Sequence, residues 1–292
     1  MSATQTSSAG SVGARLLSFI RRRQFFIFFF LVFLTSWLPW IIGRDWAIWT
    51  VSLVGILMVA LTAGKEGLLD LGRRTIKWRV DIRLWLIVLF LPAMIAIVAL
   101  GIYALIGGQI PNLTFLRDEW VLLPLFFLAM IFPAILGGRN AGPLAEEFGW
   151  RGYAQPAMQR PYGALRAALV IGFFWGIWHL PQFYTPGSTQ AALGGLLMLF
   201  PFTIGEISNS VIMAWLHNKT GGSLLLAGIL WHAFISAWSV LLILGTSPSM
   251  LIGNEPTAPT SSTLIWIHNG VLALTALLFV VRSSGHLGQE GS

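Results

Sequence analysis

The chain has 292 residues, of which 56% are hydrophobic and only 10% are charged, and its mean hydropathy is +0.76. Soluble domains are about 45–50% apolar and about 25% charged, so this composition excludes an ordinary water-facing domain. Because there is no cysteine, disulfides, thiolate metal ligands and a cysteine nucleophile are also excluded. The net charge of +7 comes from basic residues in short stretches between apolar runs, which is typical of membrane flanks and argues against nucleic-acid binding.

Apolar runs follow one another along most of the chain, and each is long enough to cross a bilayer, which takes roughly 20 residues. They predict an all-α, polytopic transmembrane helical bundle in residues 21–284, after a disordered cytoplasmic segment at 1–20 and before a tail at 285–292. The eight expected spans are Phe25–Ile42, Trp46–Ala63, Leu84–Ile106, Val121–Leu136, Ala167–Tyr184, Leu193–Leu216, Leu224–Leu244 and Leu264–Val281.

Basic residues concentrate in alternate loops between these spans. One set of loops carries Arg15, Arg21–Arg23, Lys65, Arg73, Arg74, Lys77, Arg79, Arg139, Arg151, Arg160, Arg166, Lys219 and Arg282. Because lysine and arginine favour cytoplasmic loops, both termini are expected in the cytoplasm, and a bacterial cytoplasmic membrane is the expected location. Within the second of these loops, residues 68–80 are apolar on one face and basic on the other, which predicts an interfacial amphipathic helix.

Ionisable groups inside apolar segments cost roughly 2.5–3.5 kcal/mol each on insertion scales, so they are functional candidates. The first group is Glu146, Glu147 and Arg151. On a helix, Glu147 and Arg151 lie four residues apart and can form an ion pair. Glu146 is turned about 100° away, which leaves it available as a base. A solvated charged turn is the alternative reading of this segment.

Two histidines lie inside later spans, and most single histidines on apolar helices are packing residues. His179 is near the end of one span, and His232 has Ser236 one turn later on the same face. A desolvated glutamate can take a proton from water, while histidine or hydroxyl groups orient that water or stabilise an oxyanion. The set Glu146, His179 and His232 could equally bind zinc with one open position, and the sequence does not separate these two mechanisms.

These residues resemble the motifs of the CPBP family of intramembrane proteases, which includes CAAX proteases and bacteriocin-processing enzymes and is also called the Abi family. The motif E-E-x-x-x-R matches Glu146, Glu147 and Arg151; F-x-x-x-H matches at His179, with Trp175 in place of phenylalanine. The last motif, H-x-x-x-N, matches at His232, with Ser236 in place of asparagine. Asn209 on the preceding span is a candidate substitute for that amide.

The resemblance implies peptide-bond hydrolysis. Some members of the family cleave prenylated proteins at their CAAX tails. It implies that Glu146 activates water together with His179, while His232 and Ser236 stabilise the oxyanion. The expected partners are membrane lipids and a peptide or lipidated-protein substrate, with no nucleic acid. Two alternatives remain on sequence alone: a non-catalytic scaffold or immunity protein on the same fold, or a transporter whose polar residues form an ion relay.

The expected spans create one geometric difficulty. A crossing that ends at Leu136 leaves Glu146 at the inner face, whereas His179 lies roughly 20 Å deep at 1.5 Å per residue. The two meet only if the Glu146 segment lies within the membrane. We therefore expect a buried or re-entrant helix from about Pro143 to Met158, preceded by a break at Gly138 and Gly142.

Overall fold

The computed structural model describes residues 6–132, 142–185, 188–192, 194–252 and 261–289. The described residues are helical with connecting turns and contain no strand, which confirms the predicted all-α class. The longer elements are α1 (Thr6–Arg22), α2 (Gln24–Ile41), α3 (Thr50–Thr75), α4 (Ile82–Leu105), α6 (Leu123–Ile131), α8 (Gln155–Tyr162), α9 (Ala164–Trp178), α12 (Leu199–Lys219), α13 (Trp231–Trp238) and α15 (Ser262–Arg282).

Short elements connect or extend these helices. They are α5 (Phe115–Asp118), η1 (Trp120–Leu122), α7 (Gly142–Glu147), α10 (Leu180–Tyr184), α11 (Thr189–Ala192), η4 (Gly195–Met198) and α14 (Pro248–Ile252). Three further short elements are π-helical turns, namely η3 (Phe148–Ala154), η5 (Leu225–Leu230) and η6 (Ser239–Ile243). Such turns are often found at functional sites; here η3 follows Glu147 and contains Arg151, and η5 ends two residues before His232.

Seven helical segments among the described residues are long and apolar enough to cross a membrane, and they match seven of the eight expected spans. The exception is the expected span Val121–Leu136, where the structure has a shorter apolar helix at Trp120–Ile131. The end of the expected span, like the predicted break at Gly138, lies outside the described residues. The sequence is as apolar here as elsewhere, so hydropathy alone did not show that the helix is short.

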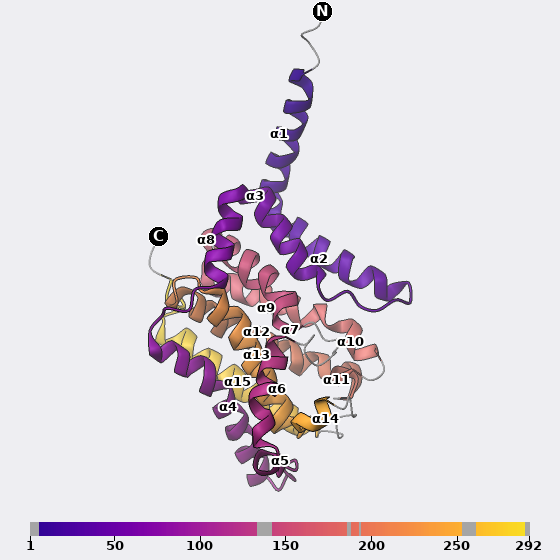
Figure 1. Ribbon diagram of the computed structural model, residues 1–292, viewed down its shortest axis with the longest axis vertical. Coiled ribbons are helices and arrows are strands. Elements are labelled where there is room, and N and C mark those ends of the chain that lie inside the picture. The colour runs from indigo at the N-terminus through magenta and orange to yellow at the C-terminus, as the bar shows by residue number, and fades with distance from the viewer. Residues whose placement is uncertain (1–5, 133–141, 186–187, 193, 253–260, 290–292) are drawn as a thin grey trace, which may run out of the picture.

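The motif helix begins after this short helix and runs without interruption from α7 through η3 to α8. Its 21 residues are long enough to cover roughly 30 Å at 1.5 Å per residue, and Glu146, Glu147 and Arg151 on it are all buried. Figure 1 shows α6 and α7 following one another through the bundle, with α8 beside α9. The predicted buried helix is therefore confirmed.

Small residues let the helices that carry this segment approach closely. A Cβ atom added at Gly149 would overlap the carbonyl oxygen of Val51, and one added at Gly55 would lie 2.5 Å from the Cα of Gly149. A Cβ at Gly172 would similarly lie 2.5 Å from the Cα of Ile207. Close backbone approach of this kind is typical of helix pairs in membranes. It fixes α3 against η3 and α9 against α12.

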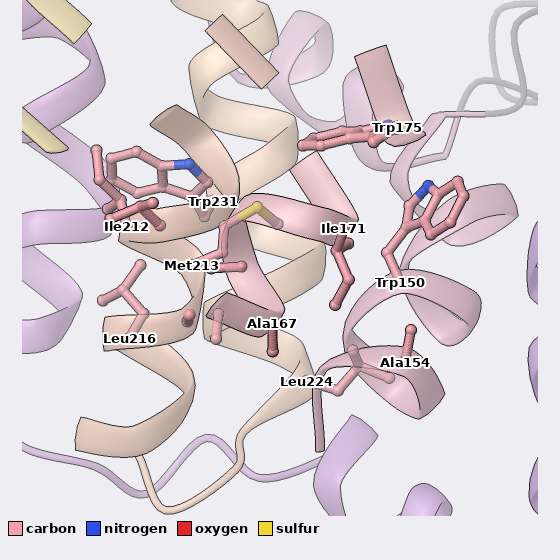
Figure 2. Packing of buried hydrophobic residues seen from close by; sticks show 14 of the residues in the cluster. Trp150, Ala154, Ala167, Ile171, Trp175, Ile212, Met213, Leu216, Leu224 and Trp231 are labelled. Carbon is pink, nitrogen blue, oxygen red and sulfur yellow. The ribbon is translucent and has the colours of Figure 1, made fainter. Parts of the chain in front are cut away.

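Large side chains fill the remaining interior. Trp150, Trp175 and Trp231 are each 1% exposed or less, and Figure 2 shows them around the aliphatic cluster that includes Ile212 and Met213. Close-packed residues of this size hold neighbouring side chains in single rotamers. The motif residues are therefore mounted on a rigid interior rather than on surface loops.

The N-terminal region differs from the sequence-based expectation. Residues from Thr6 to Arg22 form α1, whereas the sequence predicts disorder up to residue 20, and Figure 1 shows this helix extending away from the bundle. The predicted amphipathic stretch is the final part of α3, which bends at Gly64 (φ 62°) and ends at Thr75. Residues 76–81 are not helical, so the amphipathic helix is shorter than predicted.

Candidate active site

Glu147 is the anchor of a buried charged network. Its Oε1 lies 3.4 Å from Nη1 of Arg151, which confirms the ion pair that the four-residue spacing predicts. The same oxygen lies 2.8 Å from Nδ1 of His232, a residue 85 positions later in the chain. Glu147 and Arg151 are no more than 1% exposed, and the Arg151 guanidinium lies 4.2 Å from the centre of the Trp175 ring. Glu147 thus connects η3 to α13.

Space for the Glu147 carboxylate comes from a glycine on the facing turn. A Cβ atom added at Gly228 of η5 would lie 3.3 Å from both Cβ and Oε2 of Glu147 and 2.9 Å from Leu224. The η5 turn therefore approaches the motif helix as closely as a side-chain-free residue permits. This contact sets the distance at which His232, four residues later, reaches the carboxylate.

Glu146 faces a different side of the helix, as the predicted 100° rotation requires. Its Oε2 accepts a hydrogen bond of 2.6 Å from Nε1 of Trp175, and the residue is 5% exposed. Trp175 stands where the resembling family has phenylalanine, and only the indole can donate this hydrogen bond.

His179 directly follows α9 and is surrounded by aromatic rings of Trp46, Trp178 and Phe202. Its Nδ1 lies 2.8 Å from the carbonyl oxygen of Trp175. A carbonyl oxygen only accepts, so Nδ1 donates, and Nε2 of the neutral ring is left as an acceptor. The indole and the backbone of Trp175 thus orient both Glu146 and His179.

One cavity of about 350 Å³ joins these groups. Its lining includes the four residues expected to be catalytic (Glu146, His179, His232 and Ser236) and the supporting residue Asn209. The Asn209 Oδ1 accepts a hydrogen bond of 3.2 Å from Nε1 of Trp231. Its Nδ2 makes only a long contact of 3.5 Å with Glu206, so this amide retains a proton for a ligand in the cavity.

Glu206, Ser239 and His268 are further polar residues in the lining of the same cavity. The Oγ of Ser239 lies 3.5 Å from Nε2 of His268, on α15. The sequence shows His268 and Glu206 as ionisable groups in or beside apolar runs, and this is the feature by which they could have been recognised as site residues. It does not show that α15 packs against α12 and faces the motif residues, because that depends on helix packing.

The residues suggested as zinc ligands do not converge on a metal-sized position. Among the described residues, no group of three or more His, Asp or Glu side chains is arranged to hold a metal ion. The hydrogen bonds of these residues to Trp175 and Glu147 leave Oε1 of Glu146 and Nε2 of each histidine free, so the bonds themselves do not prevent metal binding. A tetrahedral zinc site needs at least three protein ligands aimed at one point. The donor arrangement does not fit such a site, and no catalytic step is derived through zinc.

A helical membrane bundle that encloses a carboxylate, two oriented imidazoles and amide and hydroxyl donors in one cavity has the composition of an intramembrane hydrolase. Comparison with known proteins agrees with this class. Residues 119–238 match the family model described as type II CAAX prenyl endopeptidase Rce1-like. The chain is also similar to CAAX prenyl protease 2 of Methanococcus maripaludis, with 29% identity over 138 residues.

That alignment covers 47% of this chain and 45% of the relative, so the chain spans about half of the relative's length. The region matched by the family model includes Glu146, Glu147, Arg151, His179 and His232. The comparisons thus confirm the resemblance to CAAX proteases that the sequence motifs indicate. They do so over the part of the chain that carries the motif helix and the cavity.

Proposed function

We propose that this chain is an intramembrane endopeptidase in which Glu146 activates a water molecule. The observation that carries the proposal is the shared cavity, which brings Glu146 and His179 together with His232 and Ser236 from segments up to 90 residues apart. Peptide-bond hydrolysis needs a base, a position for water and donors for the oxyanion. The lining of this cavity supplies each of them.

The water molecule is placed between Glu146 and His179. Trp175 occupies Oε2 of Glu146, which leaves Oε1 to take a proton from water. The acceptor Nε2 of His179 orients the second water proton. As the water oxygen bonds to the scissile carbonyl carbon, its proton passes to Glu146, and Glu146 then donates that proton to the departing amine. The carboxylate is regenerated when the C–N bond breaks.

Stabilisation of the oxyanion is assigned to α13 and α12. The Glu147 carboxylate bonded to Nδ1 of His232 favours the imidazolium form, whose Nε2–H can donate to the developing negative charge. The Ser236 hydroxyl is one turn away on the same helix face. The Asn209 amide lines the same cavity and supplies the longer-reaching donor that the serine lacks.

The substrate is proposed to be a peptide segment of a membrane-associated protein. Apolar residues such as Ile48, Phe202, Ile235 and Leu272 share the cavity lining with the polar groups, which suits an apolar or lipid-modified segment. The name of the Methanococcus relative supports a prenylated CAAX-like tail as one such substrate.

The decisive experiment is proteolysis of a peptide library by purified protein in detergent. Glu146→Gln keeps an oxygen for the Trp175 hydrogen bond but removes the base, and we expect a loss of about 10²–10⁴-fold in kcat. Glu206→Gln is the matched control, because Glu206 is a carboxyl group in the same cavity with no assigned proton transfer. Its activity should remain within a few-fold of wild type.

A chelator tests the metal alternative in the same assay. The proposal expects wild-type cleavage to persist after chelation, because no step uses a metal. Equal activity of wild type and Glu146→Gln would refute the protease mechanism. Activity that is lost on chelation and restored by zinc would instead show that Glu146, His179 and His232 rearrange around a metal.

A further inference from the structure

A groove of about 1000 Å³, separate from the catalytic cavity, lies where α12 and α15 end. Its lining comes from these two helices, from α4 and from residues 283–289 that follow α15. α15 packs against both α4 and α12 (Figure 1). The groove shares no lining residue with the catalytic cavity. We call this hollow, which is bordered by Trp215, Lys219, Phe279 and Arg282, the C-terminal groove.

The wall of the C-terminal groove is mainly apolar. Phe279 lies three residues before Arg282 on α15, so the two share one face of that helix, and Trp215 of α12 packs edge-on against Phe279 with ring centroids 4.6 Å apart. Thr275 extends the lining to about 10 Å from Arg282 at 1.5 Å per residue. The helices concerned are all long and apolar enough to cross a membrane, so this wall lies beside the acyl chains of the bilayer. The further apolar lining residues are Ile87, Leu91 and Leu278.

Two cations lie at the end of this apolar wall. Lys219 is the last residue of α12 and Arg282 the last residue of α15, so each ends a membrane-crossing segment, at the level of the polar headgroups. Both side chains are exposed, and no ion pair among the residues that the structure describes includes either of them. Within the described part of the chain, the lining of the groove contains no carboxylate. The groove therefore presents positive charge without a counter-charge, directly beside an apolar surface.

Residues 283–289 are held in place as one side of the groove. Leu287 is fully buried, and its carbonyl oxygen accepts a hydrogen bond of 3.0 Å from Nδ2 of Asn218. Oε1 of Gln289 accepts another, also of 3.0 Å, from the first backbone N–H of α9. A Cβ atom added at Gly288 would lie 2.8 Å from Cε of Lys219, so this segment lies directly on the aliphatic stem of the lysine. These contacts make the groove a fixed feature of the fold.

A phospholipid with an anionic headgroup matches this arrangement, because it places a phosphate at the membrane surface and an acyl chain in the hydrocarbon. Basic pockets between transmembrane helices bind such headgroups. We propose that the C-terminal groove binds one anionic phospholipid, with its phosphate at Lys219 and Arg282 and the upper part of one acyl chain along Trp215, Thr275 and Phe279. A free anion such as glycerol 3-phosphate shares the headgroup chemistry but would leave the apolar wall uncovered.

Native mass spectrometry of the full-length protein in detergent measures this binding. The protein is titrated with phosphatidylglycerol and with zwitterionic phosphatidylcholine of the same acyl chains, and glycerol 3-phosphate is added as a competitor. Lys219→Gln/Arg282→Gln removes both cations. Lys65→Gln/Arg73→Gln is the matched control, because it removes the same charge from exposed positions of α3 outside the groove. Thr275→Trp keeps both cations and fills the apolar part of the groove, and the hydroxyl that it removes donates to a carbonyl oxygen of its own helix.

We expect the wild-type protein to bind phosphatidylglycerol about 10-fold more tightly than phosphatidylcholine, or better. Lys219→Gln/Arg282→Gln should lose this preference, Lys65→Gln/Arg73→Gln should keep it, and Thr275→Trp should weaken phosphatidylglycerol binding several-fold. Equal wild-type affinity for the two lipids, or equal losses in the two double variants, would overturn the proposal, since the attraction would then not belong to the groove.

Unchanged phosphatidylglycerol binding by Thr275→Trp would also overturn the proposal, because the acyl chain would then lie elsewhere. Displacement of phosphatidylglycerol by glycerol 3-phosphate would identify a free anion as the ligand and would overturn it as well. Because lipid binding requires no proteolysis, the outcome is independent of the protease assay.

Discussion

Removing the charge of Glu147 should destabilise the protein far more than removing the charge of the adjacent Glu146. Glu147 and Arg151 are 0% and 1% exposed, so solvent does not screen their interaction. Glu147→Gln leaves the Arg151 guanidinium buried without a counter-charge, and breaking a buried pair in this way costs about 3–5 kcal/mol. The Nη1–Oε1 distance of 3.4 Å is long for an ion pair, which favours the lower value.

A loss of about 3 kcal/mol corresponds to a decrease in Tm of roughly 6–12 °C for a chain of this size. The assay is thermal unfolding in detergent, followed by circular dichroism. Glu146→Gln is the matched control, since its amide can still accept from Trp175 and an amide is less costly to bury than a carboxylate. Its Tm should be unchanged or higher.

The double variant Glu147→Gln/Arg151→Gln completes the cycle. Because it leaves neither charge unpaired, its loss of stability should be smaller than the sum of the two single losses by at least about 1 kcal/mol. Strict additivity would refute the reasoning, since it would mean that the two charges are not coupled. A Tm for Glu147→Gln equal to that of Glu146→Gln would refute it as well.

Three further predictions concern activity and packing. Ser236→Asn should raise kcat several-fold, because the longer amide side chain on α13 reaches further as a hydrogen-bond donor. Asn209→Ala should lower kcat about 10-fold or more. Unchanged rates of both variants in the library assay would show that neither residue binds the oxyanion. Gly176→Ala puts a Cβ 2.8 Å from the Thr203 backbone and should lower Tm by several degrees, while Gly270→Ala, with open space, should not; equal Tm values would rule out the close α9–α12 contact.

Much of the fold follows from local properties of the sequence. Seven expected spans correspond to apolar helices, because about 20 apolar residues suffice to define a crossing. The Glu147–Arg151 pair was also predictable, since residues four apart on a helix always share a face. Likewise, the divergence of Glu146 and Glu147 needs only the 100° turn per residue.

The span at Val121–Leu136 shows where local properties are insufficient. Hydropathy cannot distinguish a full crossing at Val121–Leu136 from the short helix Trp120–Ile131, and it gives no sign that the charged motif helix after it lies inside the bundle. The position of Glu146 within the bundle depends on that distinction. Only the packing of α8 beside α9 brings Glu146 and His179 to the same cavity.

The sequence by itself determined the class of the protein, most of its spans and the motif residues, since these depend on composition and on spacing within one helix. Tertiary structure decided which of those residues share a cavity. The bond between Glu147 and His232 joins residues 85 positions apart, and the bond between Trp175 and Glu146 joins residues 29 positions apart. Such pairs depend on the depth of each helix in the bundle and on its rotation about its own axis. Both are set by close packing at residues such as Gly149, Gly172 and Gly228.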